Sequence, residues 1–489
     1  MSKIHYLTTA LTCAACLPGV AFGAKNQKQA SGKSNPLSNS KMNIVFVFAD
    51  DWGWGDLSGH GHPGLKTPNL DKMASEGIDF TQFNVCSPVS SSSRTAVMTG
   101  HFPSRHNIHQ HLAGPSINAS RGMANFAPVD AAIMGKMMQK AGYKTAHFGK
   151  WHLGNNGGAP EPAEYGFDAT CVYNGRGPQI KQGPAEYPSA FYTQQAVDLA
   201  IDFIGKNKKS PFFVNVWIHE THHAIEPSPE MRIPYLDVEE PQQSYYSVVT
   251  SADENIGRLM TFLKEQGLDE NTLVIFSSDN GPAPNDTKRT WNSVGVTGGQ
   301  KGQKHSLYEG GVRIPFIVRL PGIVPAGKVD KHSFIAAVDL LPTFCDIAGI
   351  ELPESHKPDG EVITNVLLGN KFDRTKTVLQ FWQGRDTGHD WPRLTAKDNN
   401  YKLVMNYDMS RVELYDYRND WGEEKNLASQ HPDVVEKLSK EALAYFKSLN
   451  IKPEHLAFGT AEKVKKTPEE IAKAKAKKAA KQAKKDTLE

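Results

Sequence analysis

Short runs of apolar residues recur along the chain, and helix-like segments separate them. The runs are short and unbroken, as expected for strands that are buried on both faces, and they cover residues 43–48, 143–148, 211–218, 272–276 and 314–320. The helix-like segments cover residues 69–76, 129–141, 194–206, 244–266 and 337–348. Strands that alternate with helices form a mostly parallel sheet with helices on both faces, so the pattern predicts an α/β fold.

The pattern changes near residue 372, where shorter strand-like runs replace the alternation. These runs cover residues 377–382, 401–406 and 412–415, and a helical segment follows at 432–449. We therefore expect a main domain at 42–371 and a smaller C-terminal α+β subdomain at 372–455. The Lys/Ala-rich residues 456–489 are expected to form a solvated tail, with a helix that begins after Thr467-Pro-Glu-Glu470.

The N-terminal residues 1–23 resemble an export signal. A basic start precedes an apolar run, and small residues stand where a signal peptidase cleaves. The sequence predicts an exported protein, periplasmic or secreted, with the polar residues 24–41 as a linker. Lipoprotein anchoring is the alternative, because Cys13 and Cys16 lie in small apolar surroundings. No later segment has the run of about 20 apolar residues that a membrane span needs.

Composition narrows the choice of partners and of redox chemistry. The formal net charge of +2 includes a C-terminal stretch, residues 461–489, with ten lysines and five acidic residues. The rest of the chain is therefore slightly acidic, and nucleic-acid binding is not predicted. Three cysteines follow the signal segment: Cys86, Cys171 and Cys345. They allow one disulfide, but not a scaffold that depends on disulfides.

Acidic residues follow two of the predicted strands. Asp50 and Asp51 come directly after the first strand, and Asp279 and Asn280 follow the strand at 272–276. Open α/β sheets bind ligands at the carboxyl ends of their strands. Three crowded carboxylates and an amide oxygen would repel one another without a cation, and all-oxygen ligation selects a hard ion such as Ca²⁺ or Mg²⁺. Each aspartate taken alone also fits a turn position.

A serine and an arginine lie four residues apart at the start of another expected helix. Ser90 and Arg94 share one face of that helix, and the free N–H groups of its first turn attract anions. A Ser-rich loop that caps a helix is the simpler alternative. Cys86 is a competing nucleophile, but it lies eight residues before Arg94, so the spacing favours Ser90.

Residues 84–100 resemble the signature of type I sulfatases, which belong to the alkaline-phosphatase-like superfamily. In this signature a Cys or Ser precedes an Arg by four residues, and Thr-Gly ends the helix. In this chain the first position is Ser90, as in the serine-type members of the family, and Ser92 replaces the usual proline. Further family blocks follow in order as Thr67-Pro-Asn-Leu-Asp71, Leu307-Tyr-Glu-Gly-Gly311, Asp339-Leu-Leu-Pro-Thr343 and Glu413-Leu-Tyr-Asp416. The resemblance implies that a sulfatase-maturing enzyme oxidises Ser90 to formylglycine, whose hydrate attacks a sulfate ester.

The same resemblance assigns a metal ion to the acidic strand ends. The ligands that it implies for one Ca²⁺ ion are Asp50, Asp51, Ser90, Asp279 and Asn280. It also implies that Asp279 helps to remove a proton from the formylglycine hydrate.

Basic residues complete the implied site. The residues that would hold the hydrate and the sulfuryl group are Arg94, Lys150 and Lys304. Lys150 and His152 lie in a family block, Phe148-Gly-Lys-Trp-His-Leu-Gly154, and their side chains point to the same side if the chain stays extended. Lys301 is the alternative to Lys304, but spacing from the Tyr-Glu-Gly-Gly block favours Lys304.

Histidines supply the expected proton transfers. His219-Glu-Thr-His222-His223 matches the zinc-protease motif H-E-x-x-H, but that motif requires a helix and this segment follows a strand-like run. In the sulfatase resemblance His222 is the general acid for the leaving alcohol, with His223 as an alternative, and His152 assists sulfate release. Three further histidines either line the pocket or belong to a surface loop: His106, His109 and His111.

The sequence as a whole predicts an exported calcium-dependent sulfatase that acts on a sulfated carbohydrate, such as a glycosaminoglycan or a mucin-type glycan. Aromatic loops at 382–386 and 389–393 would either bind sugar rings or pack between the two domains. One alternative is a phosphomonoester or phosphonate hydrolase of the same superfamily. The other is a sulfoglycan-binding protein without catalytic activity, which would follow if Ser90 is unmodified.

Overall fold

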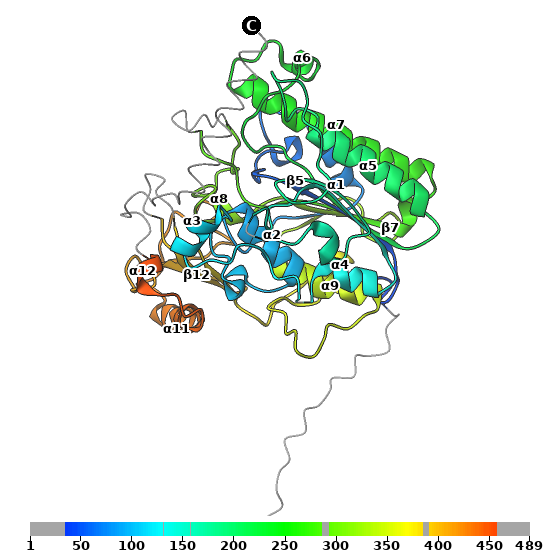
Figure 1. The fold of residues 1–489 in the computed structure, drawn as a ribbon. Helices are drawn as coiled ribbons and strands as arrows, with labels where there is room; N and C mark the ends of the chain where they lie inside the picture. The colour runs from blue at the N-terminus through cyan, green and yellow to red at the C-terminus, as the bar shows by residue number, and fades with distance from the viewer. Residues whose placement is uncertain (1–34, 131, 157, 286–292, 385–390, 457–489) are drawn as a thin grey trace, which may run out of the picture. The chain divides into compact units, whose positions relative to one another are not determined.

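The structure is a computed structural model that describes residues 35–456, except 131, 157, 286–292 and 385–390. The predicted signal segment, most of the linker and nearly all of the Lys/Ala-rich tail lie outside the described residues. The described residues from Asn35 to Leu456 belong to one compact unit. Its centre is an eight-stranded sheet with helices on both faces (Figure 1).

The strands predicted for the main domain are all present in this sheet. They are β1 (Asn43–Ala49), β4 (Lys144–Lys150), β6 (Phe212–Trp217), β7 (Thr272–Ser278) and β8 (Phe316–Arg319). The strand order is β5-β4-β6-β1-β7-β8-β2-β9, and the five strands from β5 to β7 are parallel. Strand β8 is antiparallel to β7. The predicted α/β class, with a mostly parallel sheet, is therefore confirmed.

Five further strands were not predicted from the sequence. They are β2 (Ile78–Phe80), β3 (Phe83–Asn84), β5 (Ala169–Tyr173), β9 (Lys328–Asp330) and β10 (Ile335–Ala336). Four of them have three residues or fewer, which is too short for a recognisable apolar run. Strand β5 lies at an edge of the sheet and is only partly buried, so it also lacks such a run.

Strand β1 shows how one apolar run serves two cores. Ile44, Phe46 and Phe48 pack into the core that contains α2 (Ser90–Thr99), α4 (Met134–Lys140) and α9 (Leu340–Ala348). Val45 and Val47 pack into the opposite core, which contains α1 (Pro68–Ser75), α5 (Tyr192–Asn207) and α7 (Gln242–Glu265). Figure 1 shows these two helix layers on the two faces of the sheet.

Helix α4 begins five residues later than the sequence predicts. Ile133 is buried and extended, with φ −122°, so the helix can begin only at Met134. The other predicted helices of the main domain are present, and Pro68 occupies the first turn of α1 as expected. The helices of four to six residues are α3 (Pro115–Ser120), α6 (Pro229–Arg232), α8 (Glu309–Val312), α10 (Thr364–Leu367) and α12 (Pro453–Leu456).

The C-terminal part is an antiparallel sheet of four strands with a covering helix. Its elements are β11 (Val378–Phe381), β12 (Leu394–Lys397), β13 (Lys402–Met405), β14 (Glu413–Tyr415) and α11 (Pro432–Ser448). The predicted α+β subdomain is confirmed, and β12 is its one strand that the sequence did not indicate. Across the described ranges, no helix is both long and apolar enough to cross a membrane.

Candidate active site

The predicted site residues converge at one edge of the central sheet. Strands β4, β6, β1 and β7 are parallel neighbours, so the residues that end or follow them lie side by side. In strand order these residues are Lys150, His222, Asp50 with Asp51, and Asp279 with Asn280. Helix α2 adds Ser90 and Arg94 from its first turns. This helix ends at Thr99 and is capped by Gly100, whose φ of 63° suits glycine, as the Thr-Gly pair predicts.

The Ser90 hydroxyl lies among the expected metal ligands. It donates to Asp50 Oδ1 at 3.2 Å and lies 3.5 Å from Asn280 Oδ1. It also accepts a hydrogen bond from Lys150 Nζ at 3.0 Å. The structure thus brings together the oxygen atom that would be oxidised, two ligand oxygens and a cation.

Three carboxylates and three cations form a buried charge cluster around this hydroxyl. The ion pairs are Lys150 with Asp50, Lys304 with Asp51 at 2.6 Å, and Arg94 with Asp279 at 2.7 Å. The most exposed of these six side chains is Lys304, at 7%. An unpaired buried charge is costly. Removal of one partner from any of these pairs would leave the other charge unpaired and would strongly destabilise the folded protein.

The two aspartates after β1 differ in their electrostatics. Burial raises the pKa of Asp50, but the charge of Lys150 and of other nearby cations outweighs burial and leaves this pKa well below its usual value. Burial raises the pKa of Asp51 to about 6, although Lys304 opposes this effect. A cation bound beside Asp51 would favour its ionised form.

The guanidinium of Arg94 lies behind Asp279, away from solvent. Its Nε donates to Asp279 Oδ2 at 2.8 Å, and its two terminal nitrogens reach the carbonyl oxygens of Lys150 and Ala49 at 3.4 Å. The ring of Trp217 covers it at 4.9 Å. In this position Arg94 orients Asp279, and its side chain is fully buried.

The two candidate lysines of residues 300–306 have different surroundings. Lys304 pairs with Asp51 in the charge cluster. Lys301 instead lies 4.1 Å from the centre of the Tyr308 ring and donates to the Tyr415 hydroxyl at 2.9 Å. The structure therefore places Lys304, and not Lys301, in the charge cluster.

The segment His219-Glu-Thr-His222-His223 is irregular and forms no helix, so the zinc-protease geometry is absent from it. The Nδ1 of His222 donates to the carbonyl oxygen of His223 at 2.8 Å, which leaves Nε2 for chemistry. A nitrogen of His222 and carboxylate oxygens of Asp50 and Asp51 lie within 4.8 Å of one another. Burial holds the pKa of His222 well below 6.5, although the charge of Asp50 opposes this effect.

His152 does not follow the extended path that the sequence suggested. Strand β4 ends at Lys150, and His152 has a left-handed backbone with φ 53°. The alternation argument for Lys150 and His152 is therefore wrong. The Nε2 of His152 lies 3.3 Å from the carbonyl oxygen of Leu112, and burial, with a smaller effect of Lys150, lowers the pKa of His152 to about 3.

Two residues that contact or lie close to Asp50 were not predicted to belong to the site, Tyr173 and His219. The Tyr173 hydroxyl donates to Asp50 Oδ2 at 3.3 Å, and His219 Nδ1 lies 2.6 Å from the same hydroxyl. Tyr173 ends β5 and pairs in register with Lys150. The signal that would have found it is the pairing of β5 with β4, which apolar periodicity does not reveal.

Several other candidates lie outside this cluster. Cys86 is buried in the apolar core, which raises its thiol pKa to about 12, so it is a poor nucleophile. His106 Nε2 lies 3.2 Å from His101 Nδ1, and the ring of His101 stacks on His356, which binds the Thr99 carbonyl at the far end of α2. His106 therefore does not line the site.

The remaining candidates have packing contacts. His109 packs against Phe381. His111 lies next to Leu112, and the N–H of Leu112 donates to Ser91 Oγ in the first turn of α2. Trp382 is 1% exposed and stacks on His305, and Trp391 packs against Tyr308. These contacts favour the interdomain packing role for both tryptophans.

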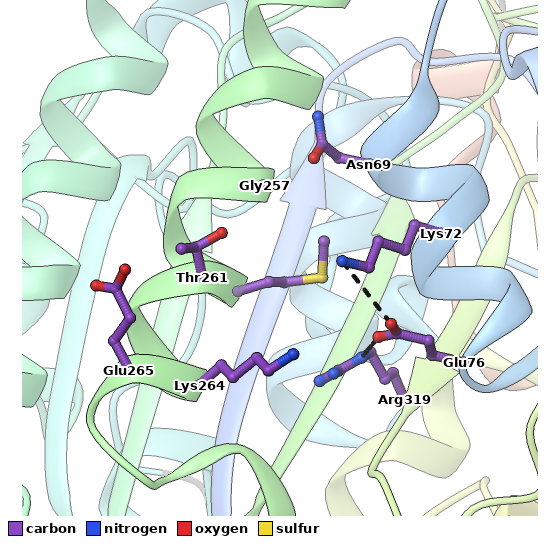
Figure 2. Close-up of a pocket in the computed structure, with 9 residues that line it drawn as sticks. Asn69, Lys72, Glu76, Gly257, Thr261, Lys264, Glu265 and Arg319 are labelled. Carbon is purple, nitrogen blue, oxygen red and sulfur yellow. Dashed lines mark hydrogen bonds and ion pairs between the residues drawn. The ribbon is translucent and has the colours of Figure 1, made fainter.

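A groove of about 500 Å³ between α1 and α7 lies away from this cluster (Figure 2). Lys72, Lys264 and Glu265 line it, and Arg319 is paired there with Glu76. Arg319 pairs in register with Val274 near the start of β7. Asp279 follows the other end of the same strand. The groove therefore opens at the opposite edge of the sheet and contains none of the predicted site residues.

Comparison with known proteins identifies the family of this chain. Residues 42–350 match the family described as Sulfatase, and residues 301–447 match the N-sulphoglucosamine sulphohydrolase C-terminal family. The N-acetylgalactosamine-6-O-sulfatase of Bacteroides thetaiotaomicron is 28% identical, over 87% of this chain and 96% of its own length. Human arylsulfatase A is 32% identical, over 81% of this chain and 86% of its own length.

Solved structures share the fold. The crystal structure of Ps i-CgsB in complex with k-i-k-neocarrahexaose superimposes with a TM-score of 0.72 at 25% identity, over 84% of this chain and 94% of that chain. The phosphonate monoester hydrolase of Agrobacterium radiobacter has the same fold at 19% identity, with a TM-score of 0.61, over 83% of this chain and 96% of that chain. Given the family match over residues 42–350 and a relative at 32% identity over most of its length, the chain belongs to the sulfatase family of sulfuric ester hydrolases.

Proposed function

We propose that this sulfatase removes sulfate from sulfated carbohydrates, with formylglycine made from Ser90 as its nucleophile. The observation that carries the proposal is the placement of the Ser90 hydroxyl between Asp50 Oδ1, Asn280 Oδ1 and Lys150 Nζ. Support for a carbohydrate substrate comes from relatives named N-acetylgalactosamine-6-sulfatase and from a structural relative in complex with a neocarrahexaose.

A calcium ion fits the donor set around Ser90. The proposed ligands are Asp50, Asp51, Asp279, Asn280 and the modified Ser90. Carboxylate and amide oxygens are hard donors that suit Ca²⁺. Bound there, calcium would supply positive charge for a sulfuryl oxygen.

The side chains around Ser90 have separate proposed roles in the reaction. The formylglycine hydrate supplies the attacking hydroxyl and a second hydroxyl through which sulfate is later released. Asp279, held by Arg94, accepts the proton of the attacking hydroxyl. Lys150 and Lys304 place positive charge beside the sulfuryl oxygens. His152 assists sulfate release.

His222 is the proposed general acid for the departing sugar oxygen. Its Nε2 is free to transfer a proton because Nδ1 is bound to the His223 carbonyl. Burial keeps the imidazole neutral in the free protein at neutral pH. The negative charge of a bound sulfate ester would raise the pKa of His222 and supply the protonated form.

Oxidation of Ser90 must precede folding. Ser90 is 3% exposed, and every residue of α2 is buried. A maturing enzyme needs the Cβ of Ser90 in its own active site, so we propose that it acts on the unfolded chain. Export by residues 1–23, to the periplasm or beyond, remains part of the same proposal.

A substrate screen tests the reaction class. We expect the matured protein to release sulfate from 6-O-sulfated N-acetylgalactosamine or from sulfated galactose oligosaccharides, measured as free sulfate by ion chromatography. The matching sugar phosphates should react at least about a hundredfold more slowly, because a single divalent ion leaves the additional charge of a phosphate monoester poorly neutralised. Faster release of phosphate would favour the phosphohydrolase alternative. Binding of the sulfated sugar without any release would favour the sulfoglycan-binding alternative.

Metal removal provides a second test. Treatment with a chelator should lower the sulfatase rate by about a hundredfold, since metal-ion charge stabilisation is worth several kcal/mol. Added Ca²⁺ should restore the rate more fully than Zn²⁺, because the ligand oxygens are hard donors. If Zn²⁺ restores the rate better, then His222 belongs to the metal site with Asp50 and Asp51, and the all-oxygen ligand set is incorrect.

A further inference from the structure

The two oxygens of the Asp50 carboxylate have different surroundings. Oδ1 faces the centre of the site and accepts from Ser90 Oγ at 3.2 Å. Oδ2 accepts from Lys150 Nζ and, at 3.3 Å, from the Tyr173 hydroxyl. Two donors therefore fix Oδ2, and Oδ1 lies beside the Ser90 hydroxyl at the proposed metal position.

The number of protons available shows which group donates in the two hydrogen bonds that link His219, Tyr173 and Asp50. A phenol has one proton, and the ionised Asp50 can only accept, so the Tyr173 proton points to Asp50 Oδ2. The Tyr173 oxygen must then accept the proton of His219 Nδ1, 2.6 Å away. Two hydrogen bonds thus run in one direction, from His219 through Tyr173 to Asp50.

Tyr173 lies on a strand, and His219 is held by aromatic packing just after one. Tyr173 is the last residue of β5, opposite Lys150 in the neighbouring strand. His219 closely follows β6 and packs edge-on against the rings of Tyr173, at 4.8 Å, and Tyr192, at 5.3 Å. Their polar atoms are therefore held in place by the sheet and by aromatic packing.

We propose that Tyr173 and His219 are positioning residues that orient the Asp50 carboxylate, so that its Oδ1 faces the metal position beside Ser90. The inference rests on the calcium site proposed above. Groups that hydrogen-bond to a metal ligand commonly change metal affinity by ten- to a hundredfold when they are removed. Neither residue touches the substrate in this role.

Calcium titration of the full-length protein tests this role. Isothermal titration calorimetry with CaCl₂ alone, after chelator treatment, gives the affinity of each variant. Tyr173→Phe removes one oxygen and should weaken calcium binding by about tenfold. Tyr192→Phe is the matched control, because it makes the same change in a ring that packs against both Tyr173 and His219, and it should leave the affinity unchanged.

Variants of His219 test the direction of the hydrogen-bond chain from His219 through Tyr173 to Asp50. His219→Leu removes the donor and should weaken binding about as much as Tyr173→Phe, while His219→Asn keeps an N–H near the Nδ1 position and should retain most of the affinity. The double variant Tyr173→Phe/His219→Leu should bind calcium about as well as Tyr173→Phe alone, because both changes interrupt the same hydrogen-bond chain to Asp50. A structural effect on folding would instead lower the melting temperature of the metal-free protein.

The outcomes separate the inference from the proposed function. Equal calcium affinity in wild type and Tyr173→Phe, or additive losses in the double variant, would overturn the positioning role alone. Failure of the wild type to bind calcium would overturn the metal site and this inference together. Tenfold weaker binding in Tyr173→Phe, with a non-additive double variant, would support the inference.

Discussion

Replacement of Ser90 by alanine is expected to lower kcat/KM for a sulfated sugar by about a millionfold, the loss seen when an enzyme loses its covalent nucleophile. Alanine has no hydroxymethyl group to oxidise, so no aldehyde hydrate can form. The buried lysines and aspartates would remain, and substrate binding should change much less than turnover. Initial rates at matched protein concentrations measure the loss.

Ser93→Ala is the matched control for this prediction. Ser93 lies in the same helix, and its hydroxyl has no hydrogen-bond partner among the described residues, so its removal should change the rate little. Intact-protein mass spectrometry adds an independent measurement, since oxidation of Ser90 to formylglycine lowers the mass by about 2 Da. A Ser90→Ala protein with more than a tenth of the wild-type rate would show that another residue is the nucleophile.

Replacement of His222 by alanine should produce a loss that depends on the leaving group. General acid catalysis contributes about a thousandfold when the leaving oxygen is a poor alkoxide. An aryl sulfate with a nitrophenol leaving group needs no proton, so its hydrolysis should fall by about tenfold or less. The ratio of kcat/KM values for the two substrates therefore isolates proton donation from binding.

His223→Ala provides the comparison with the neighbouring candidate. Its carbonyl oxygen, which alanine retains, fixes His222 Nδ1, so this variant should keep the wild-type ratio between the two substrates. A leaving-group-dependent loss in His223→Ala, and not in His222→Ala, would reverse the assignment. Equal losses on both substrates in His222→Ala would indicate a role in binding or in the metal site.

The sequence was most informative where parallel strands end. Asp50 and Asp279 could be placed together because carboxyl ends of neighbouring strands share one edge of the sheet, whereas Lys150 was assigned through the family resemblance. Ser90 and Arg94 could be placed because four-residue spacing defines one face of a helix. The spacing arguments use local patterns and a general rule of α/β architecture, and the resemblance to sulfatases joined these residues into one site.

The parts that failed depend on tertiary contacts. Periodicity does not reveal which short strand pairs with β4, so β5 and the contact of Tyr173 with Asp50 were not foreseen. His152 adopts a left-handed backbone that no spacing rule indicates. The position of Arg94 behind Asp279 likewise follows from packing against Trp217.

Under the proposed oxidation of Ser90, the complete burial of α2 fixes when the enzyme can become active. Once the ten residues of this helix are enclosed, no second protein can reach the Ser90 side chain without opening the core. In the proposed maturation, folding and oxidation of each new chain compete in time, and the outcome is permanent for that molecule. The specific activity of a preparation records how often oxidation came first, and a slower-folding variant would give the modifying enzyme a longer opportunity.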